Sequence, residues 1–464
     1  MVIKTAIICA SLVVFTHPVM ATKDTPPDFQ KLRFNEDYSY LGRKKTALSI
    51  YERLKFIPIN VSKDTFLSLG GEVRQRYAYT KNPLFGENTQ DKKGVWLGRF
   101  TLSGDLNIGP RLRLFGQLYS ALEAGRNGGP SPVDEDKLEW QNAFFDFNSS
   151  LTDTTTLTFR AGQQEIQLGS GRLVDVREGP NVRRTFDGGR LILSVPNWRI
   201  DTVVARPRQN LSGYFDNKPN RDQSLWGLYA SGGKRTLPTG QMDLYYLGFR
   251  NDMANYQQGA AKERRHSLGA RWWGETNNWD FNWEAIYQFG KFGNGNISAW
   301  TLASITGYTL SSTPMRPRFA VSWNIASGDK NPNDENIDSF NALFPRGNYF
   351  SQAAVLGPRN FVNIRPFLTL NATPKWSLTT DVNFFWRLQS EDGAYSPNGQ
   401  LVRASGGRKE KFVGTALSIS SDWNISRNLD LQAVYSLFKP GTFIKKTGSD
   451  KPINFFEATL SARF

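Results

Sequence analysis

The sequence predicts an all-β protein, a transmembrane antiparallel β-barrel of about 18 strands with short periplasmic turns and long extracellular loops. Three observations lead to this fold class. Segments in which polar and apolar residues alternate follow one another along most of the chain, every second connection between them is short, and the last segment alternates up to Phe464. Alternation with a period of two is typical of strands that have one apolar and one polar face.

The alternating segments begin at Phe66. Trp279, Phe281 and Trp283 form the clearest apolar face, with Asp280 on the opposite one. Strands do not alternate with helical patterns, which argues against a parallel sheet. The expected strands are 66–79, 95–108, 111–123, 137–148, 156–168, 186–195, 198–206, 223–232, 241–251, 264–274, 279–290, 298–311, 316–327, 360–373, 376–389, 411–425, 428–438 and 453–464.

The lengths of the connections give an independent indication. Short connections such as Gly109–Pro110 and Pro374–Lys375 alternate with long ones such as 169–185 and 328–359. A soluble sandwich has no reason to alternate in this way, whereas an outer-membrane barrel has short turns on one side and long loops on the other. A final strand that ends in Phe464 also resembles the C-terminal signal of outer-membrane proteins. We therefore expect the protein in the bacterial cell outer membrane.

The N-terminus has the pattern of a secretory signal. A positive Lys4 precedes a short apolar stretch at 6–15 and a small-residue cleavage site that ends at Ala21. With a mean hydropathy of −0.47, the chain as a whole is too polar for a protein built of spanning helices. The expected organisation is a signal peptide at 1–21, a periplasmic or plug-like segment at 22–60 with one helical turn around 47–54, and a barrel at 61–464.

Few residues are available for catalysis or metal binding. The single cysteine, Cys9, lies inside the signal, and His266 is the one histidine left after cleavage. Disulfides, thiol chemistry and histidine-based triads are thereby excluded, so we expect neither an enzyme nor a cofactor. The formal net charge of +15 favours an anionic ligand or lipid, and export argues against nucleic acid as a partner.

The stretch 159–193 carries the strongest functional pattern. Its flanks alternate like strands, and the loop between them holds four arginines among carboxylates, with Gly179–Pro180 at a turn. If the polar faces line a barrel, this loop is a natural constriction; the alternative is a solvated hairpin loop with ordinary surface charge. The residues expected to line the pore or its constriction are Arg74, Arg76, Arg99, Arg160, Glu165, Arg172, Asp175, Arg177, Glu178, Arg183, Arg184, Asp187, Arg190, Arg365 and Arg387.

Alternation also places carboxylates on the polar faces, for example Glu72, Asp146 and Asp381, so the expected lumen is mixed in charge. Most wall arginines then serve as structural ion pairs, and selectivity comes from arginines left unpaired at the narrowest point. The segment 329–335 weakly resembles a calcium loop, with Asp329, Asn331 and Asn333 as candidate ligands. It lacks the glycine at the sixth position and the glutamate at the twelfth.

Several segments resemble one known family. They are RFNEDYS (33–39), LSLGGEVRQRY (67–77), GSGRLVDVREGPNVRRTFDG (169–188), ASGDKNP (326–332) and FNALFP (340–345). They are similar to signatures of the alginate-export family of bacterial outer-membrane β-barrels. The resemblance implies an 18-stranded barrel whose arginine-rich lumen passes an anionic polysaccharide outward.

The leading hypothesis is a channel for anionic saccharides or uronate polymers, with an anionic oligo- or polysaccharide, outer-membrane lipid and periplasmic export proteins as partners. A general or small-anion porin for organic acids is the alternative within transport. A surface adhesin with a plugged barrel would instead place recognition in the loops 328–359 and 390–410. A barrel-borne hydrolase lacks a nucleophile and base in reach.

Overall fold

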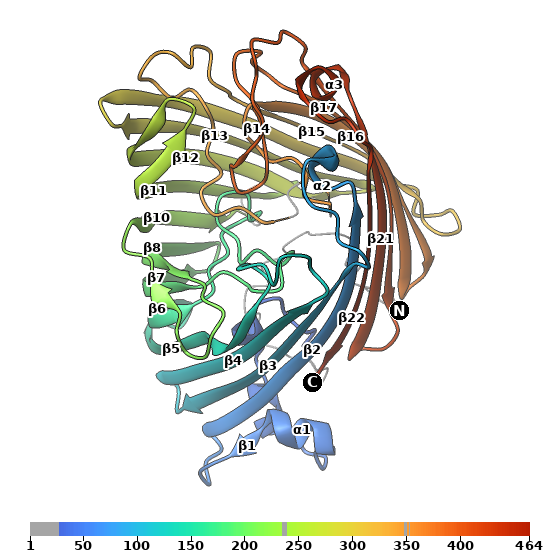
Figure 1. Cartoon of the computed structure of the whole chain (residues 1–464). Coiled ribbons are helices and arrows are strands. Elements are labelled where there is room, and N and C mark those ends of the chain that lie inside the picture. Colours follow the sequence, from blue (N-terminus) through green and yellow to red (C-terminus); the bar gives the residue numbers. More distant parts are fainter. Residues whose placement is uncertain (1–26, 234–238, 348–349, 352) are drawn as a thin grey trace.

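The computed structural model describes residues 27–233, 239–347, 350–351 and 353–464, so the expected signal peptide at 1–21 lies outside the described residues. Eighteen antiparallel strands form a closed barrel (Figure 1), which confirms the predicted fold class. The barrel strands are β2 (Thr65–Lys81), β3 (Val95–Ile108), β4 (Leu112–Ala124), β5 (Asp136–Thr152), β6 (Thr155–Gln164), β7 (Phe186–Val195), β8 (Trp198–Gln209), β10 (Gln223–Gly232), β11 (Gln241–Tyr256), β12 (Gly259–Thr276), β13 (Trp279–Phe292), β14 (Gly295–Thr309), β15 (Arg318–Ala326), β16 (Phe361–Thr373), β17 (Trp376–Trp386), β20 (Phe412–Asn424), β21 (Leu429–Pro440) and β22 (Ile453–Arg463).

The ring closes where β2 pairs with both β3 and β22. The remaining elements are short. They are the 3-10 turns η1 (Arg33–Asn35) and η2 (Ser39–Arg43), the helices α1 (Ile50–Lys55), α2 (Pro83–Gly86) and α3 (Thr442–Thr447), and the strands β1 (Ile57–Pro58), β9 (Lys218–Pro219), β18 (Ala394–Tyr395) and β19 (Leu401–Arg403). Within the described residues no helix combines the length and the apolar character needed to cross a membrane.

Burial across the wall is inverted relative to a soluble protein. Large apolar side chains such as Leu102 and Val204 are 55% and 66% exposed on the outer face. Among the largest fully buried side chains are Arg99, Arg265 and Arg271, which point inward. An apolar exterior around a polar interior is what a barrel in lipid requires.

The connections differ in length between the two ends of the barrel. Tight turns join β7 to β8 and β16 to β17, whereas the long loops lie together at the opposite end (Figure 1). At that end β11–β12 and β13–β14 are exceptions, because long strands there meet in tight hairpins. Some expected strands are shorter than predicted: β6 ends at Gln164 instead of 168, and β17 ends at Trp386 instead of 389. The alternating Ile166 and Leu168 mimic a strand but are buried inside the barrel.

The segment that precedes the barrel packs against the end with the tight turns (Figure 1). Helix α1 begins with a capping box formed by Ser49 and Glu52. Arg33 donates to the backbone oxygen of Phe464 at 2.9 Å, and Phe34 lies edge-on to a luminal phenylalanine of the wall, Phe144, at 5.2 Å. Residues from 27 to 58 thus contact both the rim and the interior of the barrel.

Candidate functional site

The loop 165–185 leaves the wall after β6 and crosses the lumen. Glu165 starts this departure: its carboxylate accepts from Gln141 at 2.6 Å and Asn142 at 3.1 Å, and it pairs with Arg183 at 2.9 Å. Its backbone N–H donates to the Asn142 side chain at 2.8 Å. These contacts replace the sheet hydrogen bonds that a longer β6 would make. Burial raises the pKa of Glu165, with the charge of Arg183 opposing that shift.

A tight turn then aims the loop back across the barrel. The Gly171 N–H donates to the Leu168 carbonyl at 3.0 Å, and the Leu168 N–H donates to the Val174 carbonyl at 3.1 Å. Gly169 has a φ of +51°, and a Cβ atom there would lie 1.7 Å from the Tyr229 hydroxyl. Glycine is required at this position because both the backbone angle and the contact exclude a side chain.

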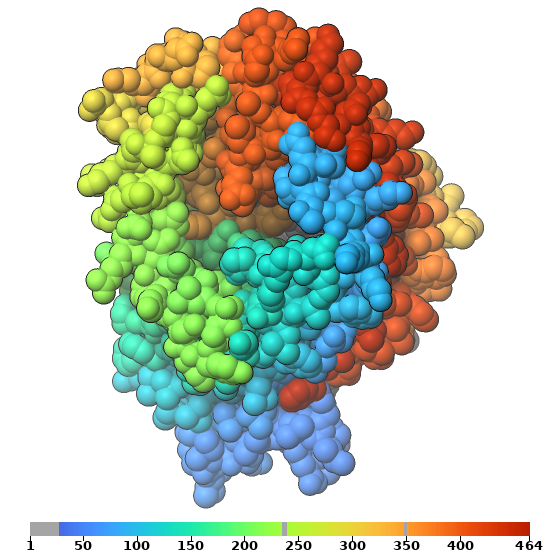
Figure 2. Space-filling model, viewed as in Figure 1, coloured from blue at the N-terminus to red at the C-terminus, as the bar shows by residue number. Residues whose placement is uncertain are grey.

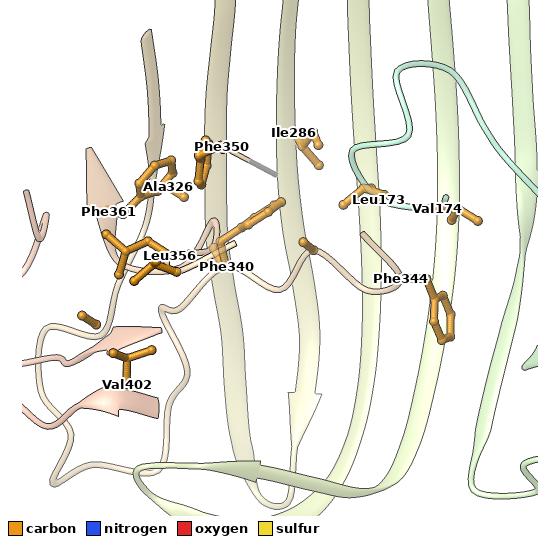
Figure 3. Packing of buried hydrophobic residues seen from close by; sticks show 14 of the residues in the cluster. Leu173, Val174, Ile286, Ala326, Phe340, Phe344, Phe350, Leu356, Phe361 and Val402 are labelled. Carbon is orange, nitrogen blue, oxygen red and sulfur yellow. The ribbon is translucent and has the colours of Figure 1, made fainter. Parts of the chain in front are cut away.

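The centre of the loop packs on a second loop, 327–360, inside the barrel. Val174 bridges Phe344 in a parallel pairing, in which the Asp175 N–H donates to the Phe344 carbonyl at 2.9 Å. Figure 3 shows Leu173 and Val174 close to Phe344, with Phe340 and further apolar side chains alongside. Burial of these groups stabilises the two loops as one body, at about 25 cal/mol per Å² of apolar surface.

Ion pairs hold one side of the loop to β2 and β3. Glu178 pairs with Arg74 at 3.0 Å, with Arg183 at 3.0 Å and with Arg99. Burial alone would raise the pKa of Glu178, but the surrounding cations outweigh burial and hold that pKa well below its usual value. Next to it, Asn181 donates to the backbone carbonyls of wall residues, including Gly98 at 3.0 Å.

The opposite side of the loop is tied to β13, and its underside to the N-terminal segment. Arg172 pairs with Glu284 at 2.9 Å, and Ser170 donates to the same carboxylate at 2.7 Å. From below, Lys31 pairs with Asp175 at 2.7 Å. The loop therefore spans the lumen from β2 to β13. Sequence reasoning missed Lys31, because nothing in its local pattern indicates that residue 31 enters the barrel.

Arg177 and Arg184 differ from the other arginines of the loop. Both are partly exposed, and among the described residues neither has a carboxylate oxygen within 4.0 Å. Arg177 donates to the Val182 carbonyl at 3.4 Å; Arg184 donates to the carbonyls of Asp175 and Pro345, each at 3.3 Å. Burial lowers the pKa of both guanidinium groups, and repulsion between the two adds to this for Arg184.

The other expected lining residues are mostly paired on the wall. Their partners are Glu457 for Arg76, Asp146 for Arg160, Asp201 for Arg190 and Asp381 for Arg365. Two lie elsewhere. Asp187 points outward on β7 and pairs with Arg208 at 3.0 Å, because it alternates with the buried Phe186. Arg387 donates to backbone carbonyls of the loop 387–411, such as Ser390 at 2.9 Å.

The weak calcium candidate forms a hydrogen-bonded turn. Asp329 accepts from the Asn331 N–H at 2.9 Å, and the Asp329 N–H donates to Asp392 at 2.8 Å. Burial raises the pKa of Asp329, which disfavours the charged form that a cation would need. Across the part of the chain that the structure describes, no group of three or more histidine, cysteine, aspartate or glutamate side chains is placed to hold a metal ion.

Several solved structures share the fold at low sequence identity. Pseudomonas aeruginosa OccD3 (OpdP) is 11% identical with a TM-score of 0.57, covering 86% of this chain and 91% of its own. Pseudomonas aeruginosa OccK5 (OpdH) is 12% identical with a TM-score of 0.54, over 86% and 98% of the two chains. Pseudomonas aeruginosa OpdK, solved with vanillate, is 10% identical with a TM-score of 0.55, over 86% and 98%.

The search of curated proteins gave no match. The family profile described as alginate export matches residues 65–455, which is most of the chain and includes the loop 165–185. This family match supports an outer-membrane channel for anionic substrates. The chain belongs to the alginate export family of bacterial outer-membrane β-barrels.

Proposed function

We propose that the barrel passes anionic saccharides or uronate polymers, and that Arg177 and Arg184 are the cations that select them. The observation that carries this proposal is their lack of carboxylate partners within the described residues, on a loop whose other charges are paired. A guanidinium group keeps its charge and binds a carboxylate with two parallel hydrogen bonds. Uronate units carry one carboxylate each, so successive units can move from one arginine to the next.

The pairing of the remaining loop charges favours passage of the substrate instead of its tight binding. Glu178 and Asp175 are engaged by Arg74, Arg99, Arg183 and Lys31, so they reduce the local field without neutralising Arg177 and Arg184. A pore must bind its substrate well enough to admit it and weakly enough to release it. Space-filling atoms leave a hollow between the cyan and green loops and the orange loops (Figure 2).

A narrower alternative is passage of small organic acids. The apolar packing of the loop 165–185 on Phe344 and its neighbours occupies part of the lumen, which favours small solutes over a polymer. For either substrate class, we propose that residues 22–60 form a periplasmic segment. This segment would limit access to the barrel from the periplasm and would be the contact site for periplasmic export partners.

The test is the reversal potential in a planar bilayer under a potassium chloride gradient, using protein refolded without residues 1–21. We expect anion selectivity, with concentration-dependent block by oligouronates stronger than block by a monouronate or benzoate. The variant with both Arg177→Ser and Arg184→Ser should lose most of the anion preference and at least about tenfold of the block. The small-acid alternative predicts block by benzoate but not by oligomers.

The matched control carries Arg264→Ser and Lys291→Ser, which removes two cations from the outer face of β12 and β13. This control should keep the wild-type selectivity. The proposal would be overturned if the wild-type pore is cation-selective. It would also be overturned if the variant with Arg177→Ser and Arg184→Ser keeps the wild-type selectivity.

A further inference from the structure

Three cations lie in one row on the outward face of the barrel. The strand register pairs Arg250 of β11 with Arg264 of β12, and Arg264 with Lys291 of β13. Arg265 and Phe292, which directly follow Arg264 and Lys291, are buried on the inward face, so alternation points the row outward. Like charges placed opposite one another on adjacent strands repel. An anion between them would turn that repulsion into attraction.

The charges of this row are largely uncompensated. Arg250 pairs with Asp252 at 2.7 Å, but within the described ranges neither Arg264 nor Lys291 has a carboxylate oxygen within 4.0 Å. Arg264 lies over the ring of Trp226, 5.9 Å from its centroid, and both it and Lys291 are exposed.

A layer of aromatic side chains lies directly below the row. The hydroxyl of Tyr246 hydrogen-bonds to Nδ1 of His266 at 2.7 Å, and the His266 ring stacks on Phe289 at 5.2 Å. Trp226 approaches the same imidazole edge-on at 6.2 Å. Aromatic girdles of this kind mark the interface between hydrocarbon and headgroups. From His266 to the turn after Thr276, a tilted strand rises about 25 Å, the height of the apolar band.

Farther toward the middle of this band the outer face is hollow. The register aligns Ala230, Leu244, Ala270, Ala285 and Leu302 across β10 to β14. Small side chains on three of these five strands leave a depression of about 700 Å³, bordered by larger residues of the neighbouring row such as Leu268, Tyr287 and Trp300. From Ala270 up to Arg264 the strand spans about 20 Å at ~3.3 Å per residue.

We propose that the outward face of β10–β14 is a binding site for a phosphorylated, acylated glycolipid of the outer leaflet. An acyl chain fills the hollow between Ala270 and Ala285, the sugar lies over the aromatic layer, and a phosphate lies between Arg264 and Lys291. Charge complementarity identifies the headgroup, because phosphate is a strong partner for arginine. The vertical order of apolar hollow, aromatic layer and cations matches the order of chain, sugar and phosphate in such a lipid.

The test measures retention of added diphosphoryl lipid A on the full mature chain in detergent by native mass spectrometry, beside a phosphate-free form of the same lipid. We expect one diphosphoryl molecule per barrel, with the phosphate-free form retained at least about tenfold less. Arg264→Gln with Lys291→Gln should remove this preference. Ala270→Phe with Ala285→Phe, which fills the hollow, should weaken retention of both lipids.

The matched control is Lys81→Gln with Lys439→Gln. These two lysines are exposed at the same end of β2 and β21. This variant should retain the lipid like the wild type, and single-channel conductance should be unchanged in every variant, which shows that each barrel has formed. Equal retention of both lipid forms, or equal loss in the control, would overturn the proposal. The proposal would also be overturned if the wild type forms a dimer that Ala270→Phe with Ala285→Phe abolishes, because a second copy of the chain would then occupy the outward face of β10–β14.

Discussion

Arginines of the wall and arginines of the loop 165–185 face the same lumen but differ in their partners and their exposure. On the wall, Arg160 binds Asp146 through two hydrogen bonds of 2.7 Å, and its side chain is 6% exposed. On the loop, Arg177 and Arg184 donate to backbone carbonyls and stay partly exposed. The difference separates charges that hold the barrel together from charges available to a solute.

The geometry of a sheet explains this difference. Arg160 lies directly opposite Asp146 in the register of β5 and β6, so the pairing of the strands brings the two side chains together. A loop residue has no register partner, and its guanidinium takes whatever acceptors the fold supplies. For Arg184 these are carbonyl groups, which satisfy hydrogen bonds without cancelling the charge.

The largest expected effect comes from removing a wall carboxylate. Asp146→Asn leaves Arg160 buried without its counterion, which should lower the free energy of unfolding by about 3–5 kcal/mol. Selectivity should barely change, because Arg160 is shielded from the lumen by Phe34 and Phe144, whose ring centroids lie 4.5 Å and 3.9 Å from the guanidinium carbon. The measurements are urea unfolding in lipid vesicles and the reversal potential.

The control for this change is Glu391→Gln, because Glu391 pairs with a lysine, Lys409, whose side chain is 74% exposed. Loss of an exposed pair should leave the free energy of unfolding nearly unchanged. A shift in reversal potential for Asp146→Asn as large as that for the Arg177 and Arg184 double variant would end the distinction between wall and loop arginines.

A smaller effect is expected from loosening the loop itself. Glu178→Gln removes the carboxylate that Arg74, Arg99 and Arg183 share, so the loop should detach more often from β2 and β3. Trypsin added to the folded barrel should then cleave after residues 177, 183 or 184 about ten times faster than in the wild type. Single-channel conductance steps should also no longer be uniform in size. The control Asp187→Asn removes an outward pair with Arg208 and should leave cleavage unchanged. Cleavage at the wild-type rate in Glu178→Gln would show that Glu178 is no anchor.

The sequence was sufficient to predict the barrel, its strands to within a few residues and the direction of most side chains within them, because all three follow from a period of two. It was insufficient for the pairing of loop charges. Arg183 and Arg184 are adjacent and chemically identical, yet Arg183 pairs with Glu165 and Glu178 while Arg184 has carbonyl partners. That outcome depends on where the loop crosses the lumen.

The same reasoning explains the two expected lining residues that the structure places elsewhere. Asp187 is counted among the expected loop charges although the expected strand 186–195 already contains it; β7 begins at Phe186, and alternation turns Asp187 outward. Arg387 continued the alternation of β17, but the strand ends at Trp386 and the side chain ties down the following loop, with its guanidinium carbon 3.7 Å from the ring centroid of Phe443. Both residues lie one step beyond or inside a strand end, where period-two reasoning is least reliable.

Lys55 is a third kind of buried cation, beside the wall and loop arginines, and the effect expected from it is the smallest. Lys55 ends α1, donates to the Leu69 carbonyl at 2.7 Å and lies over the ring of Tyr38, 5.0 Å from its centroid. Unlike an arginine, a lysine can lose its charge when it is buried. Burial lowers the pKa of Lys55 from 10.5 to about 8, with Glu36 opposing that shift.

The direction of the pH dependence follows from this lowered pKa. Here docking means the packing of residues 27–58 against the barrel. Between pH 8 and 10.5 the docked segment has released the Lys55 proton, whereas the detached segment still holds it. Docking therefore becomes more stable as pH rises through this range. Chymotrypsin cleavage after Tyr51 should therefore slow between pH 7.5 and 9.5, relative to an unstructured peptide of the same sequence. Lys55→Met removes the titrating group and should make the ratio independent of pH. Faster relative cleavage of the wild type at pH 9.5 than at pH 7.5 would mean that Lys55 stabilises docking as a cation, as the paired arginines of the wall do. Burial without a carboxylate would then not by itself disfavour the charged form of Lys55.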